Sequence, residues 1–350
     1  MASRKKDENI MTKVVLLTGI SGQDGSYMAE LLLEEGYDVH GLVRRSSIDK
    51  FDRLEEGGIL DKITIHEGDM GDPVSLSNLI SEIRPHELYN FAAMSDVPFS
   101  FVSPFYTEIV NSLSVMVMLE AIKQSCSECK FYQASSSEMY GNPQEIPQVE
   151  STPLKPISPY AISKTSAYHY VRYYREAFGL FAINGILFNH ESPRRGDKFV
   201  TKKIVKHAVE VLANKREYIY LGNLDAKRDW GYAVDYMEAI RLMMAYEKPD
   251  DWVVSTGESH SVRSFCELVF KNLGYDLKWN GNGLSETGSI DGKTVIRISD
   301  DFYRPSDIRI LKGDASKAKY VLGWSPKTSI EDLVEKMVSH EIANTKVNHD

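Results

Sequence analysis

The sequence predicts an α/β protein with an open, doubly wound parallel sheet in its first half and a smaller, mixed α/β unit in its second half. Short apolar runs alternate with amphipathic segments six times before about residue 187, which is the rhythm of parallel strands joined by crossover helices. After about residue 189 this rhythm breaks into shorter, turn-rich segments such as residues 280–292. We therefore expect one domain at residues 1–186 and a second at residues 187–350, with a helix near residues 229–246 returning to the first.

The predicted strands are short and almost wholly apolar, as strands covered on both faces of a parallel sheet are. The segments between them carry apolar residues at helical spacing, and Gly36 and Pro85 end the first two of these segments. Sheets of this kind bind ligands at the carboxyl ends of their strands. The predicted strands are residues 13–17, 37–43, 63–66, 87–93, 130–134 and 181–187, and the predicted helices are residues 26–35, 75–83, 108–123 and 160–178.

A glycine-rich turn of the form G-x-x-G-x-x-G follows the first predicted strand. Glycines let the backbone turn tightly and approach a pyrophosphate, and the following helix N-terminus supplies amide donors and a favourable dipole. In this strand–turn–helix setting the motif predicts a Rossmann-type dinucleotide site rather than a purely structural turn. The residues concerned are Gly19, Ile20, Ser21, Gly22, Gln23 and Asp24.

The end of the second predicted strand indicates which dinucleotide binds. An NAD site often has an acidic residue there to hold the ribose hydroxyls, but this chain has Arg44, Arg45 and Ser46. Guanidinium groups bind phosphate bidentately, so these residues suit a 2′-phosphate and predict NADP. A solvated basic turn is the alternative. Asp69, after the third strand, is either a partner of the adenine amino group or only a helix cap.

Tyr160 and Lys164 lie four residues apart in a predicted helix, so their side chains share one face. A fixed ammonium beside a phenol favours the phenolate, which makes the tyrosine a usable base near neutral pH. Such pairs are common on solvated helices, but here a dinucleotide motif precedes the pair and implies hydride transfer. Ser136 and Glu138 follow the fifth predicted strand. Glu138 adds a carboxylate that simple alcohol oxidation does not require.

Composition excludes several other classes of function. The net charge is −9, which argues against broad nucleic-acid binding but not against small anionic ligands. No unbroken apolar run approaches the roughly 18 residues that span a bilayer, so we expect no membrane partner. The polar start of the chain has no apolar signal region, and the three cysteines indicate a reducing compartment without structural disulfides. We therefore expect a cytoplasmic protein.

Two of the three cysteines, Cys126 and Cys129, form a C-x-x-C pair. A redox pair or half of a zinc site is one interpretation. A zinc site needs more ligands at matching spacing, and the sequence offers none, so we expect no metal. We favour a simple helix-to-strand connection.

Longer stretches of the chain carry a more specific signal. The sequence resembles the extended short-chain dehydrogenases/reductases and, within them, the GDP-mannose 4,6-dehydratase family. The resemblance runs from residue 18 to about residue 307 and rests on the stretches TGISGQDGSYMAELLLEEGYDVHGLVRRSS, FYQASSSEMYG, SPYAISKTSAY, NGILFNHESPRRG, YLGNLDAKRDWG and YRPSD. The glycine loop and the Tyr-Lys pair mark the superfamily, whereas NHESPRRG and LGNLDAKRDWG mark the dehydratases.

The resemblance implies a reaction and a role for each catalytic residue. Tyr160 takes the proton of the mannose 4-hydroxyl while hydride passes from C4 to NADP+, and Lys164 holds the nicotinamide ribose and keeps the tyrosine acidic. Glu138 removes the C5 proton, which the 4-ketone has made acidic, and water then leaves from C6. Ser136, where the family usually has threonine, assists Tyr160 at the sugar oxygen. Hydride returns to C6, and the product is GDP-4-keto-6-deoxymannose.

The same resemblance implies the binding residues. Asp307 stands where the family commonly has a glutamate that holds the guanosine, and the arginines and lysine of the substrate set lie near the diphosphate of GDP-mannose. Besides the glycine loop and residues 44–46, the cofactor set comprises Asp69, Met70, Phe91, Ala92, Ala93, Ser95, Tyr106, Tyr160, Lys164, His190 and Arg195. The substrate set comprises Asn189, Lys203, Gly222, Arg228, Arg304 and Asp307.

Other functions on the same scaffold stay open at this point. Residues 91–96 differ from the usual family pattern near the nicotinamide, which motivates a bifunctional enzyme that also reduces the 4-keto product with NADPH. A nucleotide-sugar epimerase is a further alternative, although Glu138 would then have no task. A binding module without activity would have no reason to keep all four catalytic residues. The family commonly forms dimers or tetramers, so we expect a homodimer or homotetramer.

Overall fold

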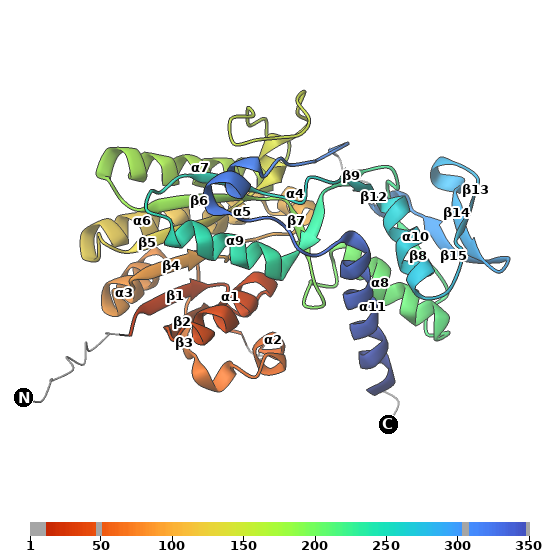
Figure 1. Ribbon diagram of the computed structural model, residues 1–350, viewed down its shortest axis with the longest axis horizontal. Helices are drawn as coiled ribbons and strands as arrows, with labels where there is room; N and C mark the ends of the chain where they lie inside the picture. The colour runs from red at the N-terminus through yellow and green to blue at the C-terminus, as the bar shows by residue number, and fades with distance from the viewer. Residues whose placement is uncertain (1–11, 47–50, 303–307, 348–350) are drawn as a thin grey trace, which may run out of the picture.

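Seven parallel strands form the larger sheet of the protein in a computed structural model that describes residues 12–46, 51–302 and 308–347 (Figure 1). Their order is β11-β6-β5-β4-β1-β2-β3, so the direction of the chain through the sheet reverses between β1 and β4. The six predicted strands are confirmed, and β11 is an addition from late in the chain. The strands are β1 (Val14–Thr18), β2 (Asp38–Val43), β3 (Thr64–Glu67), β4 (Glu87–Asn90), β5 (Lys130–Ser136), β6 (Ala182–Leu187) and β11 (Asp251–Val254).

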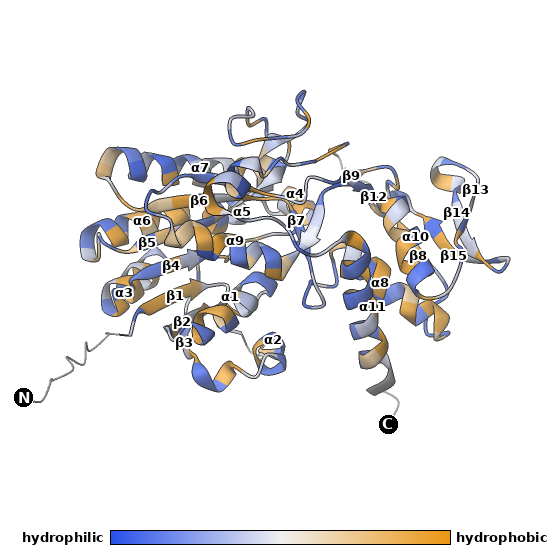
Figure 2. Cartoon of the chain, viewed as in Figure 1, coloured by the Kyte–Doolittle hydropathy of each residue, from blue (hydrophilic) through white to orange (hydrophobic). Residues whose placement is uncertain are grey.

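Helices cover both faces of this sheet, as the doubly wound prediction requires. Alternate strand residues pack on opposite faces, so Leu16 joins one apolar cluster with α3, α6 and α7 while Leu17 joins another with α1 and α9. Figure 2 shows hydrophobic residues concentrated in the central strands between these helices. The helices are α1 (Gln23–Glu34), α3 (Pro73–Ile83), α6 (Ser114–Ser125), α7 (Pro159–Phe178) and α9 (Ala233–Ala245).

One predicted helix is longer than expected. The helices α5 (Pro104–Glu108) and α6 are joined by a π-helical turn at residues Ile109–Leu113, which makes one continuous helix. An 18-residue stretch within Pro104–Ser125 has a mean hydropathy of 1.3, so by length and composition this helix meets the criterion for a membrane span, although polar residues interrupt its apolar runs. It packs against α3 and α7 as a core helix does.

A second, four-stranded sheet of order β13-β14-β15-β8 lies at the other end of the molecule, with α8, α10 and α11 packed beside it (Figure 1). Its apolar cluster includes Phe265, Phe270 and Val295, all fully buried. The boundary at residue 187 stays a prediction. The elements are α8 (Val200–Leu212), β8 (Ile219–Leu221), α10 (Val262–Asn272), β13 (Lys278–Asn280), β14 (Thr287–Ile290), β15 (Lys293–Ile298) and α11 (Ile330–Val347).

Short elements connect the two sheets. The segment where the regular rhythm breaks begins with strand β7 (Asn189–Glu191), which pairs in parallel with β10 (Trp230–Tyr232). The helix expected near residues 229–246 starts only at Ala233, because the residues just before it form strand β10. The remaining elements are α2 (Asp52–Glu56), α4 (Val97–Val102), β9 (Lys227–Arg228), β12 (His260–Ser261) and 3-10 helices at Leu60–Lys62, Ser137–Tyr140, Gly283–Ser285 and Asp300–Phe302, with a π-helical turn at Ala318–Leu322.

Candidate active site

The glycine loop lies between β1 and α1, where chain direction in the sheet reverses. Gly19 has φ +69°, and a Cβ there would lie 2.8 Å from the backbone nitrogen of Ala92. A Cβ at Gly25 would lie 2.4 Å from the carbonyl oxygen of Gly19. Both positions therefore require glycine, and the loop leaves a cradle of backbone at the start of α1 that suits a pyrophosphate. Ile20 is fully buried in the core, so only its backbone can take part.

Three buried polar side chains align the ends of the strands beside this loop. The Thr18 hydroxyl donates to Asn90 Oδ1 at 2.5 Å, and Asn90 Nδ2 donates to Gln133 Oε1 at 2.7 Å. The same Thr18 hydroxyl accepts a hydrogen bond from the backbone nitrogen of Ala92 at 3.2 Å. These hydrogen bonds link β1, β4 and β5. They therefore hold the glycine loop, residues 91–93 and the strand that ends at Ser136 in fixed positions relative to one another.

Tyr160 and Lys164 lie on the buried face of α7, close to the end of β5. Pro159 opens the helix, and the Ser158 hydroxyl caps it by accepting from the backbone nitrogen of Ala161. Lys164 Nζ donates to the carbonyl oxygen of Ala134 at 2.8 Å and lies 5.9 Å from the centre of the Tyr160 ring. Burial lowers the pKa of Lys164 to about 8. The structure thus brings the predicted pair together.

Ser136 and Glu138 stand next to this pair. The Ser136 hydroxyl caps a 3-10 helix by accepting from the backbone nitrogen of Glu138 at 3.2 Å, and it also hydrogen-bonds Tyr160. The pKa of Tyr160 is raised to about 12, chiefly by burial; the Ser136 hydrogen bond lowers it and the Glu138 carboxylate raises it. All four predicted catalytic residues therefore share one site, with the carboxylate close enough to act on the phenol.

Asp24 and His190 form a partly buried pair beside the glycine loop. His190 Nδ1 lies 2.8 Å from the carbonyl oxygen of Phe188, which can only accept, so Nδ1 carries a proton. His190 Nε2 lies 2.9 Å from Asp24 Oδ2, and this contact needs another proton. The Asp24 carboxylate raises the pKa of His190 against the effect of burial, and the pKa of Asp24 falls to about 2. The pair is therefore an imidazolium–carboxylate pair that joins α1 to β7.

Arg195 and Asn189 lie near His190 in the chain and carry polar groups that a ligand can contact. Arg195 Nε lies 3.0 Å from Glu191 Oε2, and its guanidinium lies 3.6 Å from the centre of the Phe199 ring. The Oδ1 atom of Asn189 is buried and has no hydrogen-bond partner in the structure. Buried polar atoms are normally paired, so this oxygen is suited to accept from a bound ligand.

The residues predicted to choose the dinucleotide lie at the exposed ends of β2 and β3. Arg44 Nη1 donates to the hydroxyl of Tyr106 at 3.4 Å, and Arg45 Nε lies 3.8 Å from Glu67 Oε2. Ser46, like both arginines, is exposed. Asp69 accepts from the backbone nitrogen of Gly71 at 2.7 Å, but the side chain that caps α3 is Asp72, so the helix-cap interpretation of Asp69 is wrong. Met70 packs against the apolar cluster beneath α3 and α6.

Residues 91–96 form one wall of the site, and the structure identifies a residue there that the sequence analysis missed. Phe91 is half-buried and its ring packs 5.6 Å from that of Tyr132. Asn111 accepts from the backbone nitrogen of Met94 at 2.7 Å and donates to the Ser163 hydroxyl at 3.1 Å. No sequence pattern marks Asn111; it lies in the π-helical turn, a distortion that often marks functional sites and that only the structure reveals. The further wall residues are Ala92, Ala93 and Ser95, the last of them exposed.

Of the six predicted substrate residues, Asn189 lies on β7, and three others lie on α8, directly after β8 and on β9. Lys203 lies with its Nζ 3.2 Å from the centre of the Phe302 ring, and burial lowers its pKa to about 8. A Cβ at Gly222 would lie 2.4 Å from the carbonyl oxygen of Phe302, so the glycine permits this close approach. Arg228 is buried and donates to the carbonyl oxygen of Ile308 at 2.8 Å. The other two predicted residues, Arg304 and Asp307, lie outside the described residues.

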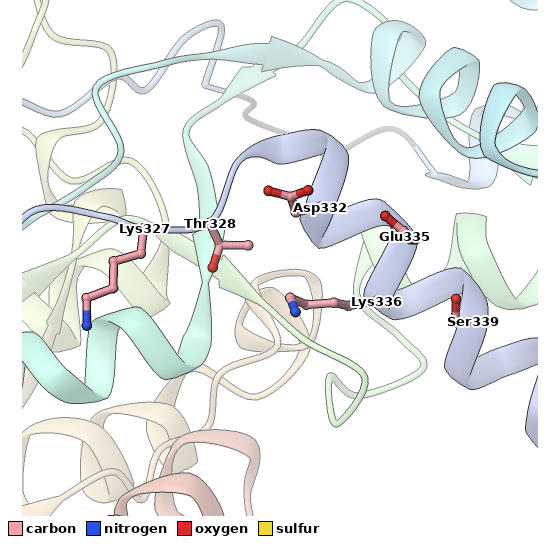
Figure 3. A pocket seen from close by; sticks show the side chains of 6 residues that line it. All are labelled: Lys327, Thr328, Asp332, Glu335, Lys336 and Ser339. Carbon is pink, nitrogen blue, oxygen red and sulfur yellow. The ribbon is translucent and has the colours of Figure 1, made fainter.

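The structure also has two surface hollows. One of about 340 Å³ is lined by Asn142, Pro143, Arg309 and Ile310, which follow Glu138 and Ile308 closely in the chain. The other, of about 490 Å³, lies along the start of α11 (Figure 3). Its lining mixes both charges and has no aromatic residue, and it does not include any predicted site residue. The lining consists of Lys327, Thr328, Asp332, Glu335, Lys336 and Ser339.

Comparison with known proteins agrees with this geometry. Solved structures with the same fold include a dTDP-glucose 4,6-dehydratase from Bacillus anthracis in complex with NAD (TM-score 0.79, 21% identity, 96% of this chain and 98% of that one). Another is RMD from Pseudomonas aeruginosa complexed with NADPH (TM-score 0.74, 21% identity, 95% of this chain and 99% of that one). At these identities the likeness establishes the fold.

Sequence similarity is more specific. The family model described as GDP-mannose 4,6 dehydratase matches residues 16–337. The GDP-mannose 4,6 dehydratase of Cricetulus griseus is 46% identical over 353 residues, which cover 98% of this chain and 95% of the relative. That of Homo sapiens is 46% identical over 346 residues, covering 96% of this chain and 93% of the relative. The chain belongs to the GDP-mannose 4,6-dehydratase family, within the extended short-chain dehydrogenases/reductases.

Proposed function

We propose that this protein converts GDP-mannose to GDP-4-keto-6-deoxymannose, as a hydro-lyase. The observation that carries the proposal is the shared site of Tyr160, Ser136 and Glu138 beside Lys164. The phenol hydrogen-bonds Ser136 and feels the charge of Glu138, so one sugar ring can meet both a base for its 4-hydroxyl and a base for its C5 proton. An epimerase that only moves hydride at C4 does not need the second base.

The proposed cofactor is NADP, within a family that uses a nicotinamide cofactor. The backbone cradle at Gly19 and Gly25 fits a pyrophosphate, and the exposed guanidinium groups of Arg44 and Arg45 fit a 2′-phosphate. When bound, the nicotinamide accepts hydride from C4 of the sugar and returns it to C6, so that no net oxidation occurs. His190 and Arg195 would complete its site.

The protein's own groups move the protons. Tyr160 takes the 4-hydroxyl proton, and Ser136 orients the same oxygen by hydrogen bonding. Lys164 supplies a positive charge that favours the phenolate over the phenol. Glu138 then removes the C5 proton, which the neighbouring 4-ketone acidifies because the resulting carbanion is an enolate. Loss of the 6-hydroxyl as water follows from that enolate.

Positively charged side chains would bind the substrate. Lys203 and Arg228, together with Arg304, suit a diphosphate, and the unpaired Oδ1 of Asn189 suits a hydroxyl donor. Asp307 would accept from the guanosine. Lys203 now faces the Phe302 ring rather than a carboxylate, so its charge is available to an anionic ligand.

We also propose a homodimer or homotetramer. Apolar side chains are exposed on one face made by α4, α5 and α7, which pack together. Val102 and Phe105 are both 78% exposed, and Ile162 is 53% exposed. A patch of this kind favours association with a second copy. The three free thiols support a cytoplasmic location, where disulfides are rare.

A product assay tests the proposed function. Purified enzyme is incubated with GDP-mannose and catalytic NADP, and the product is identified by mass spectrometry. The expected product has lost one water without net redox change. A second reaction with excess NADPH tests the reductase alternative, and NADPH consumption after the keto sugar has formed would establish it. Recovery of unchanged GDP-mannose, or of its epimer, would refute the proposal.

A further inference from the structure

Cys126 and Cys129 occupy the two ends of a tight turn between α6 and β5. The backbone nitrogen of Cys129 donates to the carbonyl oxygen of Cys126 at 2.8 Å, and the two residues between them form the turn. A turn of this type brings its end Cα atoms within about 7 Å, which overlaps the roughly 4.4–6.8 Å found across disulfides. The connection between helix and strand therefore also sets the backbone spacing that a disulfide needs.

The two thiols are neighbours with opposite character. The Ser125 hydroxyl lies 3.7 Å from Cys126 Sγ, and Cys129 Sγ donates to the carbonyl oxygen of Lys130 at 3.5 Å. The Cys129 side chain lowers the pKa of Cys126 to about 7, and the Ser125 hydroxyl and the Arg84 charge lower it too, against burial. The pKa of Cys129 is raised by the Cys126 side chain, by burial and by the Glu87 charge. One sulfur is thus poised as a thiolate and its neighbour as a thiol.

Exposure separates these sulfurs in the same way. Cys126 is partly exposed, whereas Cys129 is 2% exposed behind it. Among the residues that the structure describes, no group of three or more potential ligands could hold a metal ion. The third cysteine, Cys266, is fully buried in the other apolar cluster and has no cysteine partner.

We propose that Cys126 and Cys129 are a modification site that hydrogen peroxide converts to a reversible disulfide. The Cys126 thiolate attacks the peroxide oxygen, forming a sulfenic acid and releasing hydroxide, which is protonated to water. The Cys129 thiol then displaces the sulfenic hydroxyl as a second water and closes the sulfur–sulfur bond. Two thiols lose two electrons, the peroxide gains them, and a small thiol restores the pair by exchange.

The site is separate from the reaction centre. Cys129 precedes β5, and Ser136 ends that strand seven residues later, about 20 Å away at the usual rise per residue. The disulfide therefore does not consume any group assigned to binding or catalysis. The surrounding turn can take the new bond because it connects two packed elements at the edge of the apolar cluster beneath α6.

Peptide mapping of the intact enzyme tests the proposal directly. Trypsin releases both cysteines in one peptide, residues 124–130, and Cys266 in another, residues 264–271. The enzyme is treated with one equivalent of hydrogen peroxide at pH 7, then alkylated and digested. The expected result is a peptide 124–130 that has lost two hydrogens and that dithiothreitol restores, while the peptide with Cys266 stays unoxidised.

Variants separate the two roles and serve as controls. With excess peroxide, Cys129→Ser should let Cys126 proceed through sulfenic to sulfinic acid without losing two hydrogens, and Cys126→Ser should leave Cys129 unoxidised. Cys266→Ala should keep the disulfide. With a pKa near 7, Cys126 should alkylate about threefold faster at pH 7 than an ordinary thiol, since greater ionisation outweighs lower nucleophilicity. Free thiols after peroxide, sulfinic acid in the unsubstituted chain, or a Cys126 bridge between two copies would each overturn the proposal.

Discussion

Replacing Lys164 by methionine tests how the phenol of Tyr160 becomes a base. Both side chains are buried, and the ammonium nitrogen lies 5.9 Å from the centre of the phenol ring. At an effective dielectric constant of about 20, a unit charge at that distance stabilises a phenolate by about 3 kcal/mol, or about 2 pKa units. Lys164→Met removes this charge, so the phenolate fraction at neutral pH should fall about 100-fold.

The turnover rate and its pH dependence measure this effect. We expect kcat near pH 7 to fall about 100-fold and then to rise about tenfold per pH unit in the variant, because alkali restores the phenolate. Lys123→Met, which removes a partly exposed ammonium from α6, is the matched control and should keep normal turnover. If Lys164→Met stayed within threefold of the parent enzyme, or lost activity equally at every pH, the ammonium would not act on the phenol.

Three further predictions concern the remaining groups of the site. Glu138→Gln should slow product formation by about 10²–10⁴-fold. Absorbance in a single turnover should still show the reduced nicotinamide forming. Unhindered exchange of the C5 proton with solvent deuterium in this variant would contradict the role of the carboxylate. Arg44→Ala with Arg45→Ala should raise the Kd for NADP about 10–100-fold and leave that for NAD unchanged, and equal weakening of both in titration calorimetry would argue against a 2′-phosphate site. Asp24 has a pKa of about 2 in the folded protein against about 3.9 in the unfolded chain, so the stability that it contributes is present above pH 4 and is lost as the pH falls towards 2. Asp24→Asn should therefore make the thermal stability less dependent on pH between 4 and 2. An unchanged profile would show that the pair with His190 contributes nothing to stability.

Much of the fold follows from the sequence because each layer has its own local signal. Apolar runs between glycine or proline identify the six central strands, and helical spacing identifies the segments that cover them. β11 gives no such signal of its position, because its pairing with β6 joins residues that lie over 60 positions apart. The short strands β7 and β10 were missed because pairing over only three residues leaves no periodicity to detect.

The site was predictable where motif and strand end coincide. The glycine loop, Ser136, Glu138 and the Tyr-Lys pair all follow strands or begin helices, and the structure gathers them. The role of Asn111 depends instead on contacts to Met94 and Ser163 across the fold, which a single sequence does not reveal. The imidazolium–carboxylate pair likewise depends on distances between residues 166 positions apart.

Burial holds the phenol of Tyr160 mostly in its neutral form. With a pKa of about 12, only about one Tyr160 in 10⁵ is ionised at pH 7. Lys164, with a pKa of about 8, is mostly charged at that pH, yet it spends a hydrogen bond on the carbonyl oxygen of Ala134. Above pH 8 the lysine begins to lose its charge well before the phenol ionises, so the two titrations work against each other. The phenolate is therefore favoured by groups that donate a hydrogen bond to its oxygen and that keep Lys164 charged.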